Sequence, residues 1–174
     1  MRALGDAERI RRFMRTLGGE AAEDGAVYFT DGATAVLLGW RASTLDVDVL
    51  LLPEQESVLR AVPRLKDELQ VNVELASPRD FIPVPDGWED RSIFAAREGL
   101  LSFYHFDPYA QALAKIERGH AQDLEDVDAL VERELVDPSR ALAYLDEVED
   151  QLYRYPAIDA ASFRRRVEET FLAR

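Results

Sequence analysis

The sequence of 174 residues contains no cysteine, so neither a disulfide nor a metal site with thiolate ligands can form. It also lacks any run of about 20 apolar residues, the length that a helix needs to cross a membrane. The first residues, MRALGDAERIRRFMRTLGG, are charged throughout and lack the apolar centre of a signal peptide. From these absences we expect a cytoplasmic protein that does not associate with membranes.

Positive charge is scarce in this chain. There are 34 Asp and Glu against 21 Lys and Arg, which gives a formal net charge of -13, and only Lys66 and Lys115 are lysines. This balance argues against broad, sequence-independent binding of nucleic acid, because that binding depends on Lys and Arg neutralising phosphates. A metal ion could still bridge an acidic site to a phosphorylated substrate. Hydrophobic residues make up 47% of the chain, which is enough for an ordinary globular core.

The first 106 residues predict an α/β domain with a mixed sheet. Apolar residues at helical spacing indicate an amphipathic helix, while short apolar or alternating runs indicate strands. The amphipathic segment 54–69 contains Pro63, which we expect to bend the helix or split it in two. The other expected helices cover 6–17 and 33–39, and the expected strands cover 26–29, 46–52, 71–76 and a pair joined at Glu98-Gly99.

From Asp107 onward the sequence predicts only helices. Four segments begin at or near a residue that favours a helix N-cap and continue with helical periodicity. We therefore expect an α+β protein: residues 1–106 form a small mixed sheet flanked by helices, and residues 107–174 form a helical subdomain packed on it.

Two aspartates stand in the strand expected over 46–52. Side chains two residues apart on a strand point to the same side, so Asp46 and Asp48 share a face. Neighbouring carboxylates repel each other unless a cation lies between them, and Mg²⁺ prefers such oxygen ligands. Glu74 supplies a third carboxylate from the strand over 71–76. Three carboxylates holding two metal ions suit phosphoryl or nucleotidyl transfer. The alternative is a solvated strand end with Glu74 on the surface.

The context of this pair resembles the DNA polymerase beta superfamily of nucleotidyltransferases. In that family a Gly-Gly or Gly-Ser pair opens a helix, and Asp-x-Asp or Asp-x-Glu follows about a dozen residues later between apolar residues. Here Gly32-Ala33 precedes Asp46-Val47-Asp48-Val49 by twelve residues. Arg41 and Thr44 before the pair resemble small bacterial nucleotidyltransferase-like proteins, including toxins of toxin–antitoxin pairs. The resemblance covers residues 26–76.

The glycine motif predicts a site for nucleotide phosphates. Gly32 permits close approach of the backbone, and the amides of Ala33 and Thr34 would open a helix toward an anion. Family members often carry a serine after the glycine, and Ala33 has no hydroxyl to replace it. Thr34, Ser43 or Thr44 would have to supply that contact.

A weaker resemblance lies at residues 113–131, where a lysine precedes an Asp-Leu-x-Asp run, as in the helical segment of those small proteins. It implies that Lys115 meets nucleotide phosphates and that Asp123 and Asp126 orient Lys115 or Arg118. The alternative is that Asp123 caps a helix and its acidic neighbours favour the positive helix N-terminus.

The resemblance implies a Mg²⁺-dependent enzyme that moves a nucleoside monophosphate from an NTP to an acceptor hydroxyl. Asp46 and Asp48 would bind both metal ions, and Glu74 would hold one of them and draw the proton from the acceptor. The acceptor is an RNA, a protein or a small molecule, and an antitoxin or another helical partner protein is expected for a toxin. The alternative is a member of the fold that binds a nucleotide or a partner without catalysis.

Overall fold

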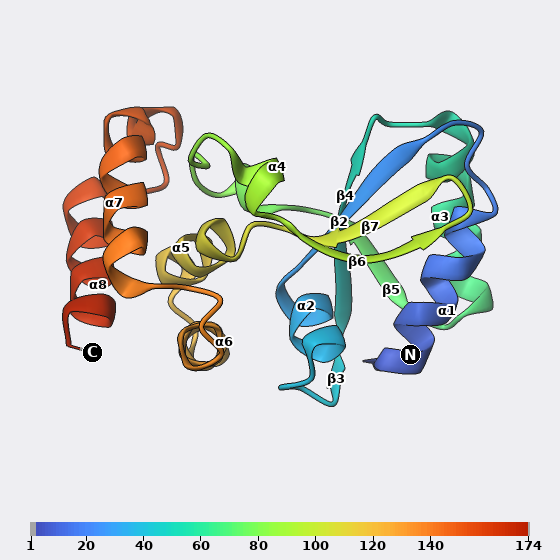
Figure 1. Cartoon of the computed structure of the whole chain (residues 1–174), viewed down its shortest axis with the longest axis horizontal. Coiled ribbons are helices and arrows are strands. Elements are labelled where there is room, and N and C mark those ends of the chain that lie inside the picture. Colours follow the sequence, from blue (N-terminus) through green and yellow to red (C-terminus); the bar gives the residue numbers. More distant parts are fainter. Residues whose placement is uncertain (1–2, 174) are drawn as a thin grey trace. The chain divides into compact units, whose positions relative to one another are not determined.

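The computed structural model of the chain describes residues 3–173. Its contacts divide the chain into two compact units, and Figure 1 labels their elements. Unit 1 comprises the chain up to Ser77 together with Ser92–Phe106, and unit 2 comprises Pro78–Arg91 together with the chain from Asp107 onward. Within the described residues, no helix is both long enough and apolar enough to cross a membrane.

Unit 1 is built on a mixed five-stranded sheet of order β5-β4-β2-β7-β6. The central strand β2 pairs antiparallel with β4 and parallel with β7. Strand β4 pairs parallel with β5, and the edge strand β6 pairs antiparallel with β7. The expected strands are confirmed within a residue or two: β2 is Gly25–Thr30, β4 is Asp46–Leu52, β5 is Asn72–Leu75, β6 is Ile93–Glu98 and β7 is Leu101–His105.

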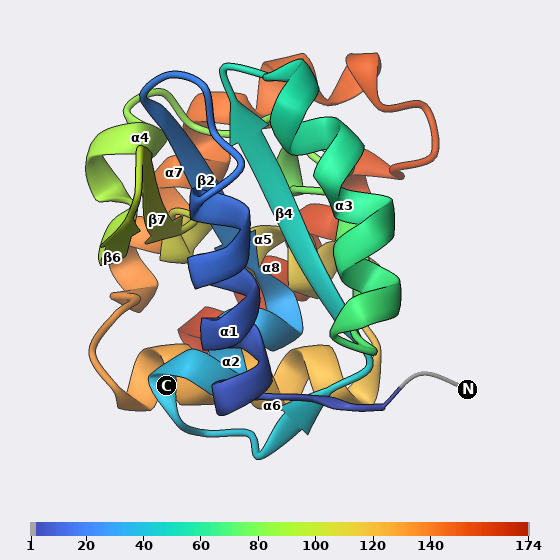
Figure 2. The same ribbon diagram turned by 90° about the vertical axis from the view of Figure 1, so that its right-hand side faces the viewer.

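Helices α1 (Ala7–Gly18) and α3 (Glu56–Glu68) cover one face of this sheet (Figure 2). Strand β4 alternates strictly along its length, with Val47, Val49 and Leu51 buried and the residues between them half-buried. The buried residues join those of α1 and α3 in one hydrophobic core, so they face the helices. The remaining side chains of β4, both aspartates included, therefore point to the opposite face of the sheet.

Helix α3 is continuous through Pro63, so of the two expected effects of this proline, a bend or a split, the split does not occur. Proline removes one backbone hydrogen bond from a helix, and the freed carbonyl needs another partner. Pro63 lies on the exposed side of α3, where water can supply that partner. The buried side, with Val58, Val62 and Leu65, keeps its apolar contacts.

Helix α2 (Asp31–Leu38) follows β2 and leads to a small second sheet. That sheet pairs β1 (Gly5–Asp6) antiparallel with β3 (Ser43–Thr44). Two strands of two residues each carry no alternation that a sequence pattern could reveal, and neither was expected. Their pairing ties the segment before β4 to the start of the chain's first helix.

Unit 2 contains the four helices that the sequence predicted. Asp107, Asp137 and Asp159 cap three of them, each accepting a hydrogen bond from a backbone amide in the first turn. The segment expected as one helix from Asp137 divides into an α-helix and a 3₁₀-helix. The helices are α5 (Pro108–Arg118), α6 (Ala121–Glu132), α7 (Pro138–Val148), the 3₁₀-helix η2 (Glu149–Arg154) and α8 (Ala160–Leu172).

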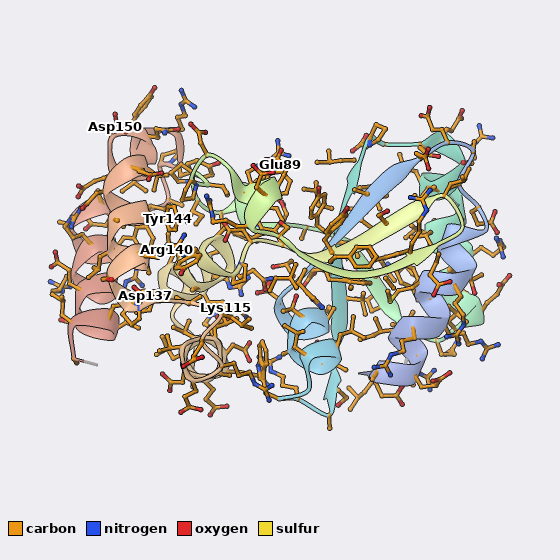
Figure 3. The ribbon with its side chains drawn as sticks, viewed as in Figure 1. Glu89, Lys115, Asp137, Arg140, Tyr144 and Asp150 are labelled. Carbon is orange, nitrogen blue, oxygen red and sulfur yellow. The ribbon has the colours of Figure 1, made fainter. Side chains whose placement is uncertain are left out.

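The irregular segment Pro78–Arg91 belongs to unit 2, whereas residues 1–106 were expected to form one domain. It contains the 3₁₀-helix η1 (Pro78–Asp80) and the short helix α4 (Trp88–Arg91). Arg91 forms an ion pair of 2.8 Å with the fully buried Asp107, and its guanidinium lies 4.3 Å from the ring centroid of Tyr144. Figure 3 shows Tyr144 on α7 beside Arg140. A charged contact of this kind, distant in sequence, attaches the segment to the helices.

Candidate active site

The sheet brings the three predicted carboxylates to neighbouring strands. Asp48 on β4 lies directly opposite Glu74 on β5 in the parallel register, and Asp46 lies opposite Asn72. Residues paired in register point to the same side of a sheet, with strands about 4.8 Å apart. Asp46, Asp48 and Glu74 therefore share the face that points away from α1 and α3.

Asn72 is a member of this site that sequence reasoning did not select. Its side-chain Nδ2 donates to Oδ1 of Asp46 at 2.6 Å and lies 3.2 Å from Oε1 of Glu74. One amide group thus bridges two carboxylates and offsets part of their repulsion without adding a charge. The sequence already placed Asn72 and Glu74 on one side of the strand over 71–76, but only Glu74 was selected as a candidate site residue.

The donor atoms at this face suit a hard cation, although the three carboxylates do not form a closed cage. Asp46 and Asp48 are half-buried and Glu74 is exposed. No group of three or more His, Asp or Glu among residues 3–173 is arranged to hold a metal ion by itself. Mg²⁺ is usually bound by only one or two carboxylates, with waters and substrate phosphates completing the shell. The residues present therefore fit Mg²⁺ that arrives with a nucleotide.

The helix of the glycine motif begins earlier than expected. Helix α2 starts at Asp31, with Thr30 as its N-cap, so its first-turn amides belong to Asp31, Gly32 and Ala33 rather than to Ala33 and Thr34. Thr30 makes no side-chain capping bond, which leaves this turn without the usual internal acceptor. The amides point toward any anion at the helix start.

Asp31 has a backbone conformation that glycine adopts more readily than aspartate does. Its φ is +54°, in the left-handed region that glycine adopts most readily and that Asp tolerates better than most residues. Its carboxylate also stands in the first turn of α2, where it interacts favourably with the helix dipole. A phosphate that docks at the same turn has to share this positive end with a fixed negative charge.

The hydroxyl of Thr30 is a buried polar group beside the carboxylate face of the sheet. The residue lies opposite Asp48 in the antiparallel register of β2 and β4, so both side chains are on the same face of the sheet. Thr30 is 2% exposed, and its Oγ1 is buried with no hydrogen-bond partner among the described residues. A buried polar atom without a partner costs roughly 1–3 kcal/mol, and this one lies between the carboxylates and the start of α2.

Gly32 is required by the protein's own packing. A Cβ built on it would lie 1.9 Å from Oγ1 of Thr44, so any side chain forces the two segments apart. Thr44 in turn donates from Oγ1 to the carbonyl of Asp46 at 3.0 Å. The predicted residues Gly32 and Thr44 thus lie together, and they hold the start of β4 against α2. Arg41 is half-buried between α2 and β3, and its amide donates to the carbonyl of Ala35.

Ala33 and Thr34 face the interior, and their side chains do not point to solvent. Ala33 is fully buried in the core. Thr34 donates from Oγ1 to the carbonyl of Phe29 at 3.3 Å and lies 3.1 Å from Nδ1 of His105. The hydroxyl of Thr34 therefore cannot replace the missing serine hydroxyl at a phosphate. Burial lowers the pKa of His105 to about 4, so its ring is neutral at pH 7.

Lys115 is buried in an ion-pair network within unit 2. It is 2% exposed, and its Nζ lies 2.8 Å from Asp126 and 3.5 Å from Asp123. Asp123 also pairs with Arg118 at 2.8 Å. The N-cap of α6 is His120, so Asp123 is not the helix cap that the alternative proposed. Both aspartates form ion pairs with these basic side chains. That they orient Lys115 or Arg118 for nucleotide phosphates stays a prediction.

A mixed sheet flanked by helices, with an Asp-x-Asp pair beside a third carboxylate and with Gly32 in the first turn of α2, is consistent with the nucleotidyltransferase fold. The chain matches the family model described as nucleotidyltransferase of unknown function (DUF6036) over residues 8–164, and it belongs to that family. Neither the curated proteins nor the solved structures that were searched include a significant match to the chain.

Proposed function

We propose that this protein is a Mg²⁺-dependent nucleotidyltransferase that moves a nucleoside monophosphate from an NTP to an acceptor hydroxyl. The observation that carries the proposal is the register of β4 and β5, which puts Asp46, Asp48 and Glu74 on one face of a sheet in a family of nucleotidyltransferases. The position of Asn72 and the orphaned hydroxyl of Thr30 at the same face support it.

The chain's own residues have distinct tasks in this reaction. Asp46 and Asp48 hold the cation and position the triphosphate, and the first-turn amides of α2 together with the hydroxyl of Thr30 bind phosphate oxygens. Glu74 accepts the proton of the acceptor hydroxyl, whose oxygen bonds to the α-phosphorus as the bond to the leaving pyrophosphate breaks. Bound Mg²⁺ supplies Lewis-acid stabilisation of the phosphate charge.

Transfer of label from an α-³²P-labelled NTP tests the proposal. Each of the four NTPs is incubated with Mg²⁺ and, in separate reactions, with total RNA, protein lysate and a small-molecule fraction. Asp48→Asn should abolish transfer while leaving the thermal melting temperature unchanged or slightly higher, because it relieves carboxylate repulsion. Glu54→Gln, an exposed position at the other end of β4, is the matched control and should transfer label as the parent does.

A member of the fold that binds a nucleotide or a partner without catalysis is the second candidate, because the carboxylate of Asp31 at the start of α2 opposes the close docking of phosphates that catalysis requires. Mg²⁺-dependent binding of an NTP without transfer to any acceptor class would support this second candidate. Absence of both binding and transfer would overturn both proposals. Loss of melting temperature by several degrees in Asp48→Asn would mean that the aspartates serve the fold.

We propose further that the protein acts as the toxin of a toxin–antitoxin pair, by its resemblance to the small bacterial proteins of that kind. Expression in a bacterial host should then arrest growth, and Asp48→Asn should restore growth at equal protein level. If Asp48→Asn still arrests growth, the toxicity does not depend on the proposed reaction. If the parent protein has no effect on growth, it is not a toxin.

A further inference from the structure

Asn72 occupies the one uncharged corner among four side chains of the candidate site. Asp46 and Asp48 stand two residues apart on β4, and Asn72 and Glu74 stand in register with them on β5. All four share the face of the sheet that points away from α1 and α3. Asn72 is half-buried at its corner, beside Asp46 across the strands and beside Glu74 along its own strand. It is therefore placed to contact two carboxylates at once.

The amide group of Asn72 holds one oxygen of each of these two carboxylates. Its Nδ2 donates to Oδ1 of Asp46 at 2.6 Å and to Oε1 of Glu74 at 3.2 Å. Ionised carboxylates only accept hydrogen bonds, so the NH₂ group with its two hydrogens has to face them, and not the amide oxygen. Each carboxylate then has a second oxygen with which to meet a cation or a proton.

The neutral charge of Asn72 matters at this corner. Asp46 and Glu74 form no ion pair with a basic side chain of residues 3–173. A lysine or arginine in place of Asn72 would hold the carboxylates but would compete with Mg²⁺ for them, and a fourth carboxylate would add repulsion. A carboxamide gives two N–H donors without a charge. Asn72 thus restrains the carboxylates and leaves their charge available to a cation.

Glu74 has the greater need of this restraint. Its side chain is exposed and has three rotatable bonds, so without a partner it would sample many rotamers. A group that accepts a proton has to lie within hydrogen-bond reach of the acceptor hydroxyl, and a small displacement lowers the rate. The hydrogen bond from Asn72 restricts Glu74 to orientations beside Asp46.

We propose that Asn72 is a positioning residue of this site, which holds Asp46 and Glu74 in the orientations that bind Mg²⁺ with the nucleotide and accept the proton. This inference rests on the proposed nucleotidyl transfer, in which Asp46 binds the cation and Glu74 is the base. Asn72 acts through these two carboxylates and does not itself have to touch the substrate.

Binding of a non-hydrolysable nucleotide measures this role without turnover. The α,β-methylene analogue of each NTP is titrated into the protein in the presence of Mg²⁺ and followed by calorimetry. Asn72→Leu should bind the preferred analogue roughly ten-fold more weakly, and its kcat for label transfer should fall by roughly 10- to 100-fold, since partners that orient metal ligands contribute about that much. Gln122→Leu, which replaces an exposed amide of α6 in unit 2, is the matched control and should leave both values unchanged.

Asn72→Asp separates a positioning role from a purely structural one. The variant keeps the size of the side chain but replaces both donors with a fourth carboxylate. Its melting temperature in EDTA should fall below that of the parent. Mg²⁺ should then raise it by several degrees more than it raises the melting temperature of the parent, because a cation relieves repulsion among four carboxylates more than among three. An amide that only supports β5 predicts the same response to Mg²⁺ in both proteins.

Two results would overturn the positioning role: affinity of Asn72→Leu for the analogue equal to that of the parent, or an equal response of Asn72→Asp and the parent to Mg²⁺. A failure of the proposed function gives a different result. If the parent binds the analogue but transfers no label, the catalytic proposal is wrong, and the positioning role rests on the affinity and on the melting response to Mg²⁺. A parent that binds no analogue in the presence of Mg²⁺ overturns both proposals.

Discussion

Replacing Lys115 by methionine should destabilise the protein strongly. Lys115 and Asp126 are 2% and 1% exposed along their side chains, and their charged atoms lie 2.8 Å apart. Methionine keeps most of the volume of lysine but leaves a buried carboxylate without its cation. Removing one partner of such a pair costs about 3–5 kcal/mol, a large part of the roughly 5–15 kcal/mol that stabilises an ordinary domain.

A double variant that also replaces Asp126 shows whether the lost stability comes from the ion pair. In Lys115→Met/Asp126→Leu no charge is left unpaired at this position, and apolar side chains of similar size replace a buried ion pair with little net cost. The double variant should therefore recover most of the stability that Lys115→Met loses. Lys66→Met changes the only other lysine, which is half-buried in the last turn of α3, and should stay within about 0.5 kcal/mol of the parent.

Urea unfolding followed by circular dichroism at pH 7 measures these differences. A loss of 3–5 kcal/mol also lowers the melting temperature by roughly 6–20 °C in a chain of this size. If Lys115→Met unfolds at the parent's urea midpoint, the buried pair contributes nothing and the reasoning is refuted. A raised Km for NTP in a normally stable Lys115→Met would then favour the contact with nucleotide phosphates that the resemblance implied.

Three further changes test unit 1. Asp31→Asn keeps a residue that tolerates the left-handed backbone but removes the charge, so NTP affinity measured by calorimetry should rise several-fold, and an unchanged affinity would place the phosphates elsewhere. Gly32→Ala should lower the melting temperature, and adding Thr44→Gly should restore part of it, because the new Cβ meets Oγ1 of Thr44. Folding lowers the pKa of His105 from 6.5 to about 4, so the unfolded chain binds a proton first as the pH falls. Between pH 6.5 and 4 the parent should therefore lose about 3 kcal/mol of unfolding free energy relative to His105→Gln, and little more below pH 4. Urea unfolding at each pH measures this difference. If the unfolding free energies of the two proteins change with pH in parallel, the ring of His105 is not held neutral by burial.

The elements with a strong local pattern could be predicted from the sequence. Polar and apolar residues alternate over Asp46-Val47-Asp48-Val49, and this pattern correctly placed both aspartates on one face of the strand. Of the two effects expected of Pro63, a bend or a split, the split does not occur, because the cost of a proline depends on which side of the helix faces water. That side is set by tertiary packing. The attachment of the segment Pro78–Arg91 to the helices depends on Arg91 and Asp107, whose pairing no local pattern reveals.

Residue types found the carboxylates of the candidate site but missed their neutral neighbours. Asn72 and Thr30 are uncharged, so their residue types alone do not indicate a metal-binding or catalytic site. Only the strand register, which places them beside Asp46 and Asp48, shows that they belong to it. The sequence selected Gly32 because glycine lets a phosphate approach the backbone closely, and that role stays a prediction. The structure gives an independent reason for glycine at this position, which is its close contact with Thr44.

Under the proposed function, the charge distribution of the site predicts that nucleotide binding depends on a cation. Asp46, Asp48 and Glu74 share one face of the sheet, and Asp31 follows Thr30, which is itself in register with Asp48. A triphosphate carries up to four negative charges, and like charges within a few ångström disfavour each other by energies on the order of 1 kcal/mol or more, depending on the local dielectric. The amides of one helix turn offset only part of this repulsion. Nucleotide affinity should therefore depend on Mg²⁺ more steeply here than it would in an Asp31→Gly variant, whose α2 turn presents its amides without a competing carboxylate.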